Sequence, residues 1–273
     1  MTRIVWALLL AVCTGLADAA ERVVVLAPHL AELACAAGAC DRLVGAVTYT
    51  DYPPQAAKLP RVGDAFAVNA EALTALHPDL VLAWTGGTPQ EILERLSGLG
   101  LRVEPVAIRG LADVAAAIER VGDLLGTPVA ARAAAAAYRQ RLAALRERYR
   151  GARPLRVMYQ IEADPAFSVN RLSPISEAIS LCGGVNVFAD MPQIAAPLSK
   201  EAVLAAAPEV VVYGEEDRAD DIRRYWQAFP QSDVVRRQRL YAVDASLLAR
   251  PSPRVLDGVE QLCGVLARAR ASG

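Results

Sequence analysis

Few residues could carry chemistry, and the sequence has no recognisable catalytic motif. Only two histidines occur, His29 and His77. His77 stands in an LHPDL segment before an apolar run, which favours a surface turn residue over a catalyst. The sequence contains no GxSxG elbow, Walker loop, HExxH helix or dinucleotide-binding glycine pattern. We therefore expect a protein that performs no catalysis.

Five single residues instead follow apolar runs that are typical of β-strands. In α/β folds, ligands bind beyond the carboxyl ends of the strands, and aromatic side chains there offer broad apolar contact to a large flat ligand. Core packing is the alternative for each of them, and it is weakest for Trp84, which Thr85-Gly86-Gly87 follows. The predicted ligand-binding residues are His29, Tyr49, Trp84, Phe167 and Arg250.

Two glutamates hold matching places in two similar segments. The segments 69–82 and 199–212 align at a constant offset, with an N-cap residue first and Glu71 or Glu201 two positions later. A carboxylate in a first helical turn is stabilised by free N–H groups and the helix dipole, which explains either one alone. Two symmetric acids would also form a matched pair of exposed docking charges, which guide orientation and association rate.

The cysteines number five in the whole chain and four without the N-terminal segment, which contains Cys13. An even number suits an oxidising compartment. Pairing by locality gives Cys35–Cys40 and Cys182–Cys263. Four buried free thiols are the alternative. A zinc site is disfavoured because neither a CxxC spacing nor a neighbouring histidine accompanies the cysteines.

The first twenty residues predict a secretory signal peptide, 1–20. Arg3 is the basic start, residues 4–16 are apolar, and Ala17-Asp18-Ala19 is a small-x-small cleavage site. A membrane anchor is the alternative, but the apolar run is shorter than the roughly 20 residues that a span needs. A lipoprotein site at Cys13 is disfavoured because the bulky Val12 precedes it.

The charge balance argues against nucleic acid as a partner. The chain has 29 basic and 30 acidic residues, so its formal net charge is −1, and no basic cluster stands out. Phosphate binding needs clustered Lys and Arg. With 54% hydrophobic residues, the chain can bury a sizeable core.

Short apolar runs alternate with helical patterns, which predicts an α/β fold with mostly parallel sheets. Between two such regions, residues 128–150 have no glycine and favour a single long helix, with Thr127 as N-cap, Pro128 at the first position and Gly151 after the end. We expect two Rossmann-like lobes, 21–127 and 151–273, joined by the helix 128–150. A cleft between the lobes is the expected ligand site.

Several segments together resemble the periplasmic cobalamin-binding proteins of ABC importers, within the wider family of siderophore, haem and cobalamin receptors. The resemblance covers nearly the whole mature chain and implies two α/β lobes bridged by one helix. The segments are DYPPQA (51–56), NAE (69–71), PDLV (78–81), AWTGG (83–87), CGG (182–184), SPR (252–254) and QLC (261–263).

The resemblance implies roles for individual residues. Tyr49 and Trp84 match aromatic cobalamin contacts, and Phe167 and Arg250 are expected to act likewise. The resemblance also implies that the two glutamates meet arginines on the importer's membrane subunits, and that Cys182 and Cys263 form a disulfide.

The chain departs from this family at three places in the expected pocket. Ala65, with Phe66 beside it, and Ala195 stand where tryptophans would be expected, and His29 replaces a small residue. The pocket is therefore expected to be wider and less aromatic. His29 could form a loop hydrogen bond or ligate a metal centre, because imidazole is a common transition-metal ligand.

These observations favour a monomeric periplasmic receptor that captures cobalamin or a related corrinoid and delivers it to an ABC importer. Cobalamin would be the transported ligand, with no permanently bound cofactor or metal. A haem or ferric-siderophore receptor of the same family is the second hypothesis. An enzyme or a structural cell-envelope protein on this scaffold is the third.

Overall fold

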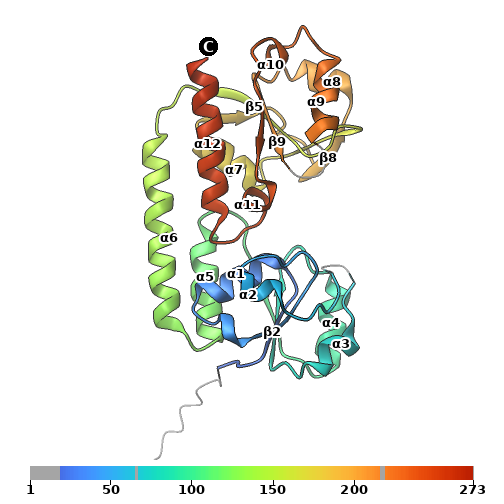
Figure 1. Cartoon of the computed structure of the whole chain (residues 1–273), viewed down its shortest axis with the longest axis vertical. Coiled ribbons are helices and arrows are strands. Elements are labelled where there is room, and N and C mark those ends of the chain that lie inside the picture. The colour runs from blue at the N-terminus through green and yellow to red at the C-terminus, as the bar shows by residue number, and fades with distance from the viewer. Residues whose placement is uncertain (1–18, 65–66, 216–218, 273) are drawn as a thin grey trace, which may run out of the picture.

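Two α/β lobes are stacked along the long axis of the molecule, and a long helix runs beside both of them (Figure 1). The computed structural model describes residues 19–64, 67–215 and 219–272. The predicted signal peptide and Ala65 with Phe66 therefore lie wholly or largely outside the described residues. Within those ranges, no helix is both long enough and apolar enough to cross a membrane.

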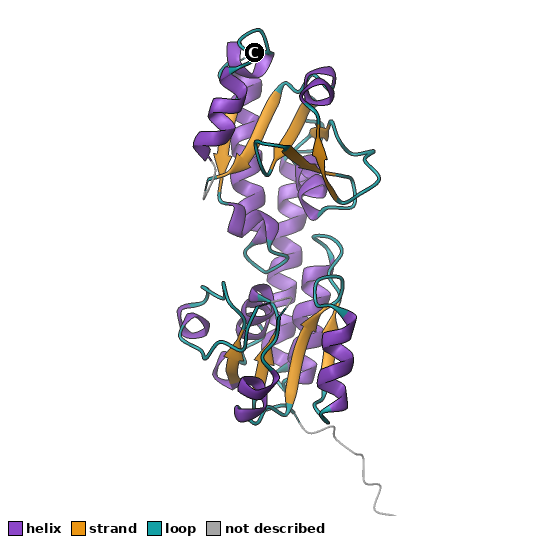
Figure 2. Ribbon diagram, turned by 90° about the vertical axis from the view of Figure 1, so that its right-hand side faces the viewer, coloured by secondary structure: helices purple, strands orange, loops and turns teal. Residues whose placement is uncertain are grey.

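The N-terminal lobe is built on a parallel sheet with strand order β2-β1-β3-β4. Because strand side chains alternate between faces, Val23 and Val25 pack on one side of the sheet and Val24 on the other. Helices α1 and α5 cover the first face, and α3 and α4 the second (Figure 2). The elements are β1 (Val23–Val25), α1 (Pro28–Ala36), η1 (Cys40–Arg42), β2 (Leu43–Ala46), α2 (Pro54–Ala57), α3 (Ala70–Ala75), β3 (Leu80–Trp84), α4 (Gln90–Gly98), β4 (Val103–Val106) and α5 (Asp113–Leu124).

The C-terminal lobe repeats this plan. Its parallel sheet has the order β7-β5-β9-β10, which is the same second-first-third-fourth arrangement in chain order. Strands β6 and β8 add a separate antiparallel ribbon. The elements are β5 (Leu155–Gln160), β6 (Ala166–Val169), α7 (Pro174–Leu181), β7 (Gly184–Asn186), β8 (Ala195–Leu198), α8 (Lys200–Ala205), β9 (Val210–Gly214), α9 (Ala219–Gln227), α10 (Asp233–Arg236), β10 (Leu240–Val243), α11 (Ala245–Ala249) and α12 (Val255–Ala271).

The sequence repeat corresponds to a repeated hydrogen-bond arrangement. In the first lobe, the Arg22 guanidinium donates to the carbonyl oxygens of Leu76 and His77 at the end of α3. In the second, Arg156 donates in the same way to those of Ala206 and Ala207 at the end of α8. Both helices therefore end in the same way. His77 is an exposed turn residue, as predicted.

The long helix α6 (Pro128–Arg148) packs against α5 of the first lobe and α12 of the second. Its buried residues recur every three or four positions, which gives one apolar stripe: Ala131, Ala135, Tyr138, Leu142 and Leu145. The helix begins at Pro128 and ends at Arg148, two residues before the predicted end at 150. Thr127 occupies the N-cap position, as predicted, but its side chain makes no capping hydrogen bond.

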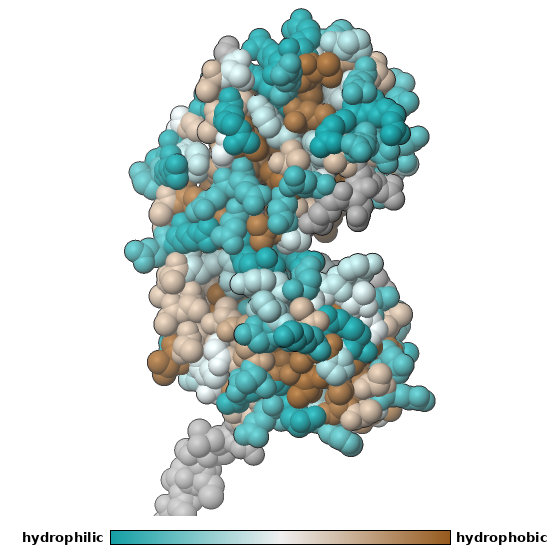
Figure 3. All heavy atoms as spheres, in the orientation of Figure 1, coloured by the Kyte–Doolittle hydropathy of each residue, from teal (hydrophilic) through white to brown (hydrophobic). Residues whose placement is uncertain are grey.

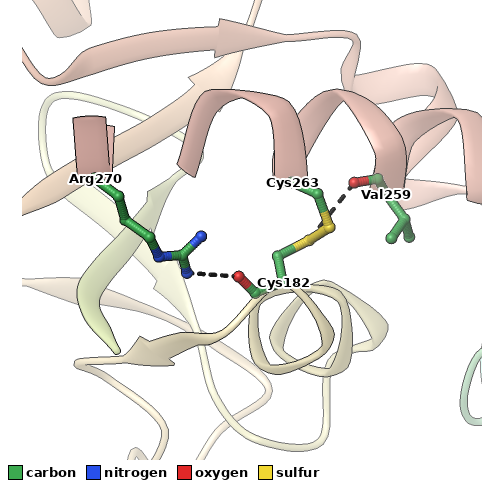
Figure 4. The surroundings of a disulfide bond; sticks show 4 residues. All are labelled: Cys182, Val259, Cys263 and Arg270. Carbon is green, nitrogen blue, oxygen red and sulfur yellow. Dashed lines mark hydrogen bonds between the residues drawn. A yellow bond between two sulfur atoms is a disulfide. The ribbon is translucent and has the colours of Figure 1, made fainter. Parts of the chain in front are cut away.

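Two disulfides hold helix ends in place. Cys35–Cys40 links the end of α1 to η1, and Cys182–Cys263 links the end of α7 to α12. Cys182 and Cys263 are fully buried, and the Arg270 guanidinium donates to the Cys182 carbonyl oxygen at 2.6 Å (Figure 4). Both pairings agree with the pairing by locality.

Candidate ligand-binding cleft

The topology of the first sheet places two predicted residues at the same crevice. Strand β1 pairs with β2 on one side and β3 on the other, so the chain changes direction across the sheet at this point. Such switch points leave an open crevice at the carboxyl ends of the strands. His29 follows β1, and Trp84 is the last residue of β3.

A hollow of about 760 Å³ lies between the lobes, where the molecular surface is indented (Figure 3). Residues that follow β3 and β4 form one wall, and the starts of α7, β8 and the chain after α11 form the other. The lining is mostly apolar, which is typical of small-molecule sites. It comprises Trp84, Thr85, Gly86, Ile108, Arg109, Arg171, Leu172, Ser173, Pro174, Glu177, Ile194, Ala249 and Pro251.

Trp84 is held by the turn that follows it. The Thr88 hydroxyl accepts a hydrogen bond from the Trp84 backbone N–H at 3.1 Å. A Cβ on Gly87 would lie 1.8 Å from Cε3 of the indole, so only glycine leaves room for the ring. The AWTGG segment thus fixes a half-buried tryptophan at the wall of the hollow.

His29 lies behind Trp84 rather than in the open cleft. It is 3% exposed, and its ring centroid is 5.0 Å from that of Trp84 in an edge-to-face arrangement. Burial, and secondly the positive charge of Arg250, lower the pKa of His29 to about 3. The imidazole is therefore neutral, and its Nε2 has no hydrogen-bond partner among the described residues.

Tyr49 and Arg250 belong to opposite lobes, and neither is among the residues that line the hollow. Arg250 instead pairs with Asp51 in the loop that carries Tyr49. Tyr49 is 77% exposed and has a positive φ of 65°, which is uncommon for a non-glycine residue. Arg250 donates to both carboxylate oxygens of Asp51, at 2.5 and 3.1 Å. Hydrogen bonding to Arg250 holds the pKa of Asp51 below its ordinary value of 3.8.

Phe167 lies in the ribbon of the second lobe, half-buried and opposite Pro197. The same ribbon brings Ile194 to the hollow. Ala195, which replaces an expected tryptophan, is exposed beside Ile194. Of these ribbon residues, the lining of the hollow includes Ile194 but neither Phe167 nor Ala195.

Sequence reasoning missed much of the lining. Ile108 and Arg109 follow β4, so the strand-end argument that selected Trp84 could have found them. Leu172 lies in a loop before α7 and carries no comparable signal, although it is exposed and apolar.

Glu71 and Glu201 occupy the first turns of α3 and α8, one in each lobe, and both are exposed. Figure 1 shows these helices on the same side of the molecule, opposite α6. A hydrogen bond from its own backbone N–H, then the Ser199 hydroxyl and the charge of Lys200, lower the pKa of Glu201. The carboxylate is therefore charged at neutral pH.

The part of the chain that the structure describes has no group of three or more His, Cys, Asp or Glu side chains placed to hold a metal ion. The cleft thus offers aromatic and apolar surface with arginine at its edges. That arrangement can bind a large organic ligand by contact.

Two similar lobes, a connecting helix and an apolar cleft between them define a two-lobed ligand receptor. The family described as periplasmic binding protein matches residues 23–245, and the chain belongs to this family.

Several proteins of known sequence or structure are similar over most of the chain. The vitamin B12-binding protein of Vibrio cholerae is 39% identical over 248 residues, which are 90% of this chain and 89% of that protein. The vitamin B12-binding protein of Yersinia pestis is 36% identical over 261 residues, 95% of this chain and 91% of that protein.

The solved structures agree. The crystal structure of the periplasmic vitamin B12-binding protein of Vibrio cholerae has a TM-score of 0.84 at 39% identity and covers 92% of this chain and 98% of its own. A periplasmic haem-binding protein in complex with two haems has a TM-score of 0.83 at 29% identity, covering 91% and 98%.

Proposed function

We propose that this protein captures cobalamin, or a closely related corrinoid, in the cleft between its lobes and delivers it to an ABC importer. The observation that carries this proposal is the mostly apolar hollow of about 760 Å³ that both lobes line, with Trp84 at its wall. The similarity to vitamin B12-binding proteins over 90% of the chain supports the choice of ligand class.

In this proposal, the corrinoid lies against side chains of both lobes. Trp84 supplies flat apolar contact area, and Tyr49 and Phe167, which do not line the hollow of the unliganded protein, add aromatic contacts to the bound ligand. Arg250 contributes a donor at the edge of the cleft. The protein changes no bond of the ligand, so its task is to bind and release.

Delivery requires export and docking. Residues 1–20 direct the chain to the periplasm and are removed there. Glu71 and Glu201 then meet arginines of the importer's membrane subunits, one glutamate from each lobe. Rim charges of this kind orient an encounter and accelerate it more than they increase affinity. The receptor acts as a monomer.

Calorimetric titration of the mature protein with cyanocobalamin tests the proposal. We expect a single site of micromolar or tighter affinity, weakened by about tenfold or more in Trp84→Ala because a buried aromatic contact is lost. Trp226 is the control position, since it is buried in the second lobe and donates to Gln160 away from the cleft. If neither cyanocobalamin nor cobinamide produced heat, the proposal that the ligand is a corrinoid would be wrong.

Haem is the second candidate, and two observations favour it. Alanines stand at positions 65 and 195, and a haem-binding protein has the same fold at 29% identity. Haem added to the purified protein would then give a Soret band that Tyr49→Ala or His29→Ala removes. His29 is buried behind Trp84, so ligation by its Nε2 would require Trp84 to move.

A further inference from the structure

A buried ion pair crosses from one lobe to the other beside the cleft. Glu32 of α1 is 2% exposed at its side chain, and its two carboxylate oxygens accept hydrogen bonds from Nε and Nη2 of Arg254, both at 2.8 Å. The residues are 222 positions apart in the chain. This two-bond geometry fixes direction as well as distance, and such charge-assisted bonds are among the stronger ones in proteins.

A second pair lies next to the first. Arg250 donates to Asp51 across 199 positions of sequence, and the Arg254 guanidinium also lies 3.7 Å above the ring of Tyr52. The loop that carries Asp51 and Tyr52 also carries Tyr49, the predicted ligand contact. Two arginines of the second lobe therefore hold both α1 and the Tyr49 loop of the first lobe.

The second lobe contacts the first at another point of the cleft as well. Glu177, which lines the hollow, accepts a hydrogen bond from the backbone N–H of Leu111 at 2.7 Å and pairs with Arg146 of α6. Ala249 and Pro251 line the hollow on either side of Arg250. Polar contacts between the lobes therefore lie beside the hollow at two places, one at Glu177 and one at Arg250.

We infer that Glu32–Arg254 and Asp51–Arg250 form a clasp that sets the height of the cleft, and that Glu32, Asp51 and Arg254 are positioning residues for ligand selectivity. This inference rests on the proposed function for the ligand, but the clasp itself is a property of the unliganded protein.

The two pairs contribute differently. Separating the lobes by even 1 Å would break the short bonds of Glu32 and leave a buried carboxylate without a partner, which is strongly unfavourable. The Asp51 side chain is 59% exposed, so its pair is weaker and is screened by salt. Glu32–Arg254 therefore sets the distance between the lobes, and Asp51–Arg250 holds the Tyr49 loop in place.

The distance between the lobes tests the clasp directly. Spin labels would be attached at Ser97→Cys on α4 and Gln227→Cys on α9, both exposed and one in each lobe. Pulsed electron paramagnetic resonance should give one narrow distance distribution for the parent protein. Glu32→Gln combined with Asp51→Asn should broaden it and move it to longer distances. Glu119→Gln, which breaks the Glu119–Arg139 pair of α5 and α6, is the matched control and should leave it unchanged.

Selectivity provides the second readout. Cobinamide lacks the nucleotide of cyanocobalamin, so a cleft with a fixed distance between the lobes should bind one of the two corrinoids more tightly. We define selectivity as the larger of their two dissociation constants divided by the smaller. This ratio should fall by roughly tenfold in the double variant. Asp51→Asn alone keeps the buried pair and serves if the double variant does not fold. Asp51→Asn should increase the dissociation rate of cyanocobalamin, and Asp51→Glu, which keeps the negative charge, should return that rate to the value of the parent protein.

The outcomes separate the two proposals. An unchanged distance distribution in folded Glu32→Gln/Asp51→Asn protein would overturn the clasp, whatever the protein binds. If the distances respond but neither corrinoid binds to the parent protein, the clasp stands and the proposed ligand is wrong. An unchanged selectivity ratio with altered distances would overturn the positioning role.

Discussion

The rings of His29 and Trp84 lie 5.0 Å apart and are inclined by 84°, so the edge of one ring meets the face of the other. Gly87 lies close to the same indole, where a Cβ could not fit. The indole is therefore confined between a buried imidazole and a bare backbone. We conclude that Trp84 is oriented before any ligand arrives, which reduces the entropy lost on binding.

Gly87→Ala should disturb this orientation. The added Cβ would lie 1.8 Å from Cε3 of Trp84, so the ring must move out of its place. We expect calorimetry with the transported ligand to show an affinity about tenfold lower, with roughly 1.4 kcal/mol lost. Gly98→Ala is the control, because a Cβ there meets nothing within 4 Å. Equal affinities for the two variants would contradict a preoriented Trp84.

His29 should make the protein less stable in mild acid. Its pKa is about 3 in the folded state and 6.5 in the unfolded chain, so between these values only the unfolded chain binds the proton. Its contribution to stability is complete above pH 6.5 and is lost as the pH falls toward 3, by about 1.4 kcal/mol per pH unit.

Urea unfolding of the parent protein and of His29→Gln between pH 4 and 7 measures this contribution. The difference between the two free energies of unfolding should shrink as the pH falls, because glutamine does not titrate. The carboxyl groups are the same in both proteins, so their titration cancels in the comparison. A difference that does not vary with pH would show that His29 has the same pKa in the folded protein as in the unfolded chain.

The two glutamates proposed for docking, Glu71 and Glu201, should be dispensable for ligand capture. Glu71→Ala with Glu201→Ala removes two exposed carboxylates that make no contact with the hollow. Ligand affinity should stay within about twofold, while uptake through the cognate importer in proteoliposomes should fall by roughly tenfold or more. Glu91→Ala is the control, since Glu91 is also an exposed acid in a first helical turn of the first lobe. Loss of ligand affinity would contradict a docking role.

Local patterns were enough to predict the two lobes and the start of α6. The buried strands are short runs of valine and leucine, and Pro128 marks a helix start because it lacks the N–H that a first position leaves unused. The strand-end argument selected Trp84, which does line the cleft.

The partners of Arg250 and Arg254 could not be predicted in this way. Asp51 and Glu32 are 199 and 222 positions distant, and no local period relates residues across two lobes. The sequence suggested Arg250 as a ligand contact but gave no sign of its partner Asp51 in the other lobe. Likewise, the burial of His29 depends on how Trp84 folds back over α1, which no neighbouring residue encodes.

The two disulfides should contribute unequally to stability. Cys182–Cys263 closes a loop of 81 residues and Cys35–Cys40 one of 5. If the bonds act by restricting the unfolded chain, removal costs about 4.5 kcal/mol for the first and about 2 kcal/mol for the second.

Paired Cys→Ala variants, compared by urea unfolding without reductant, measure both losses of unfolding free energy. Each variant serves as the control for the other, because each loses one disulfide and two sulfur atoms. Cys182 and Cys263 are also fully buried, so cavities add to their loss. Equal losses, or a larger one for Cys35–Cys40, would show that loop length does not govern the stability of this protein.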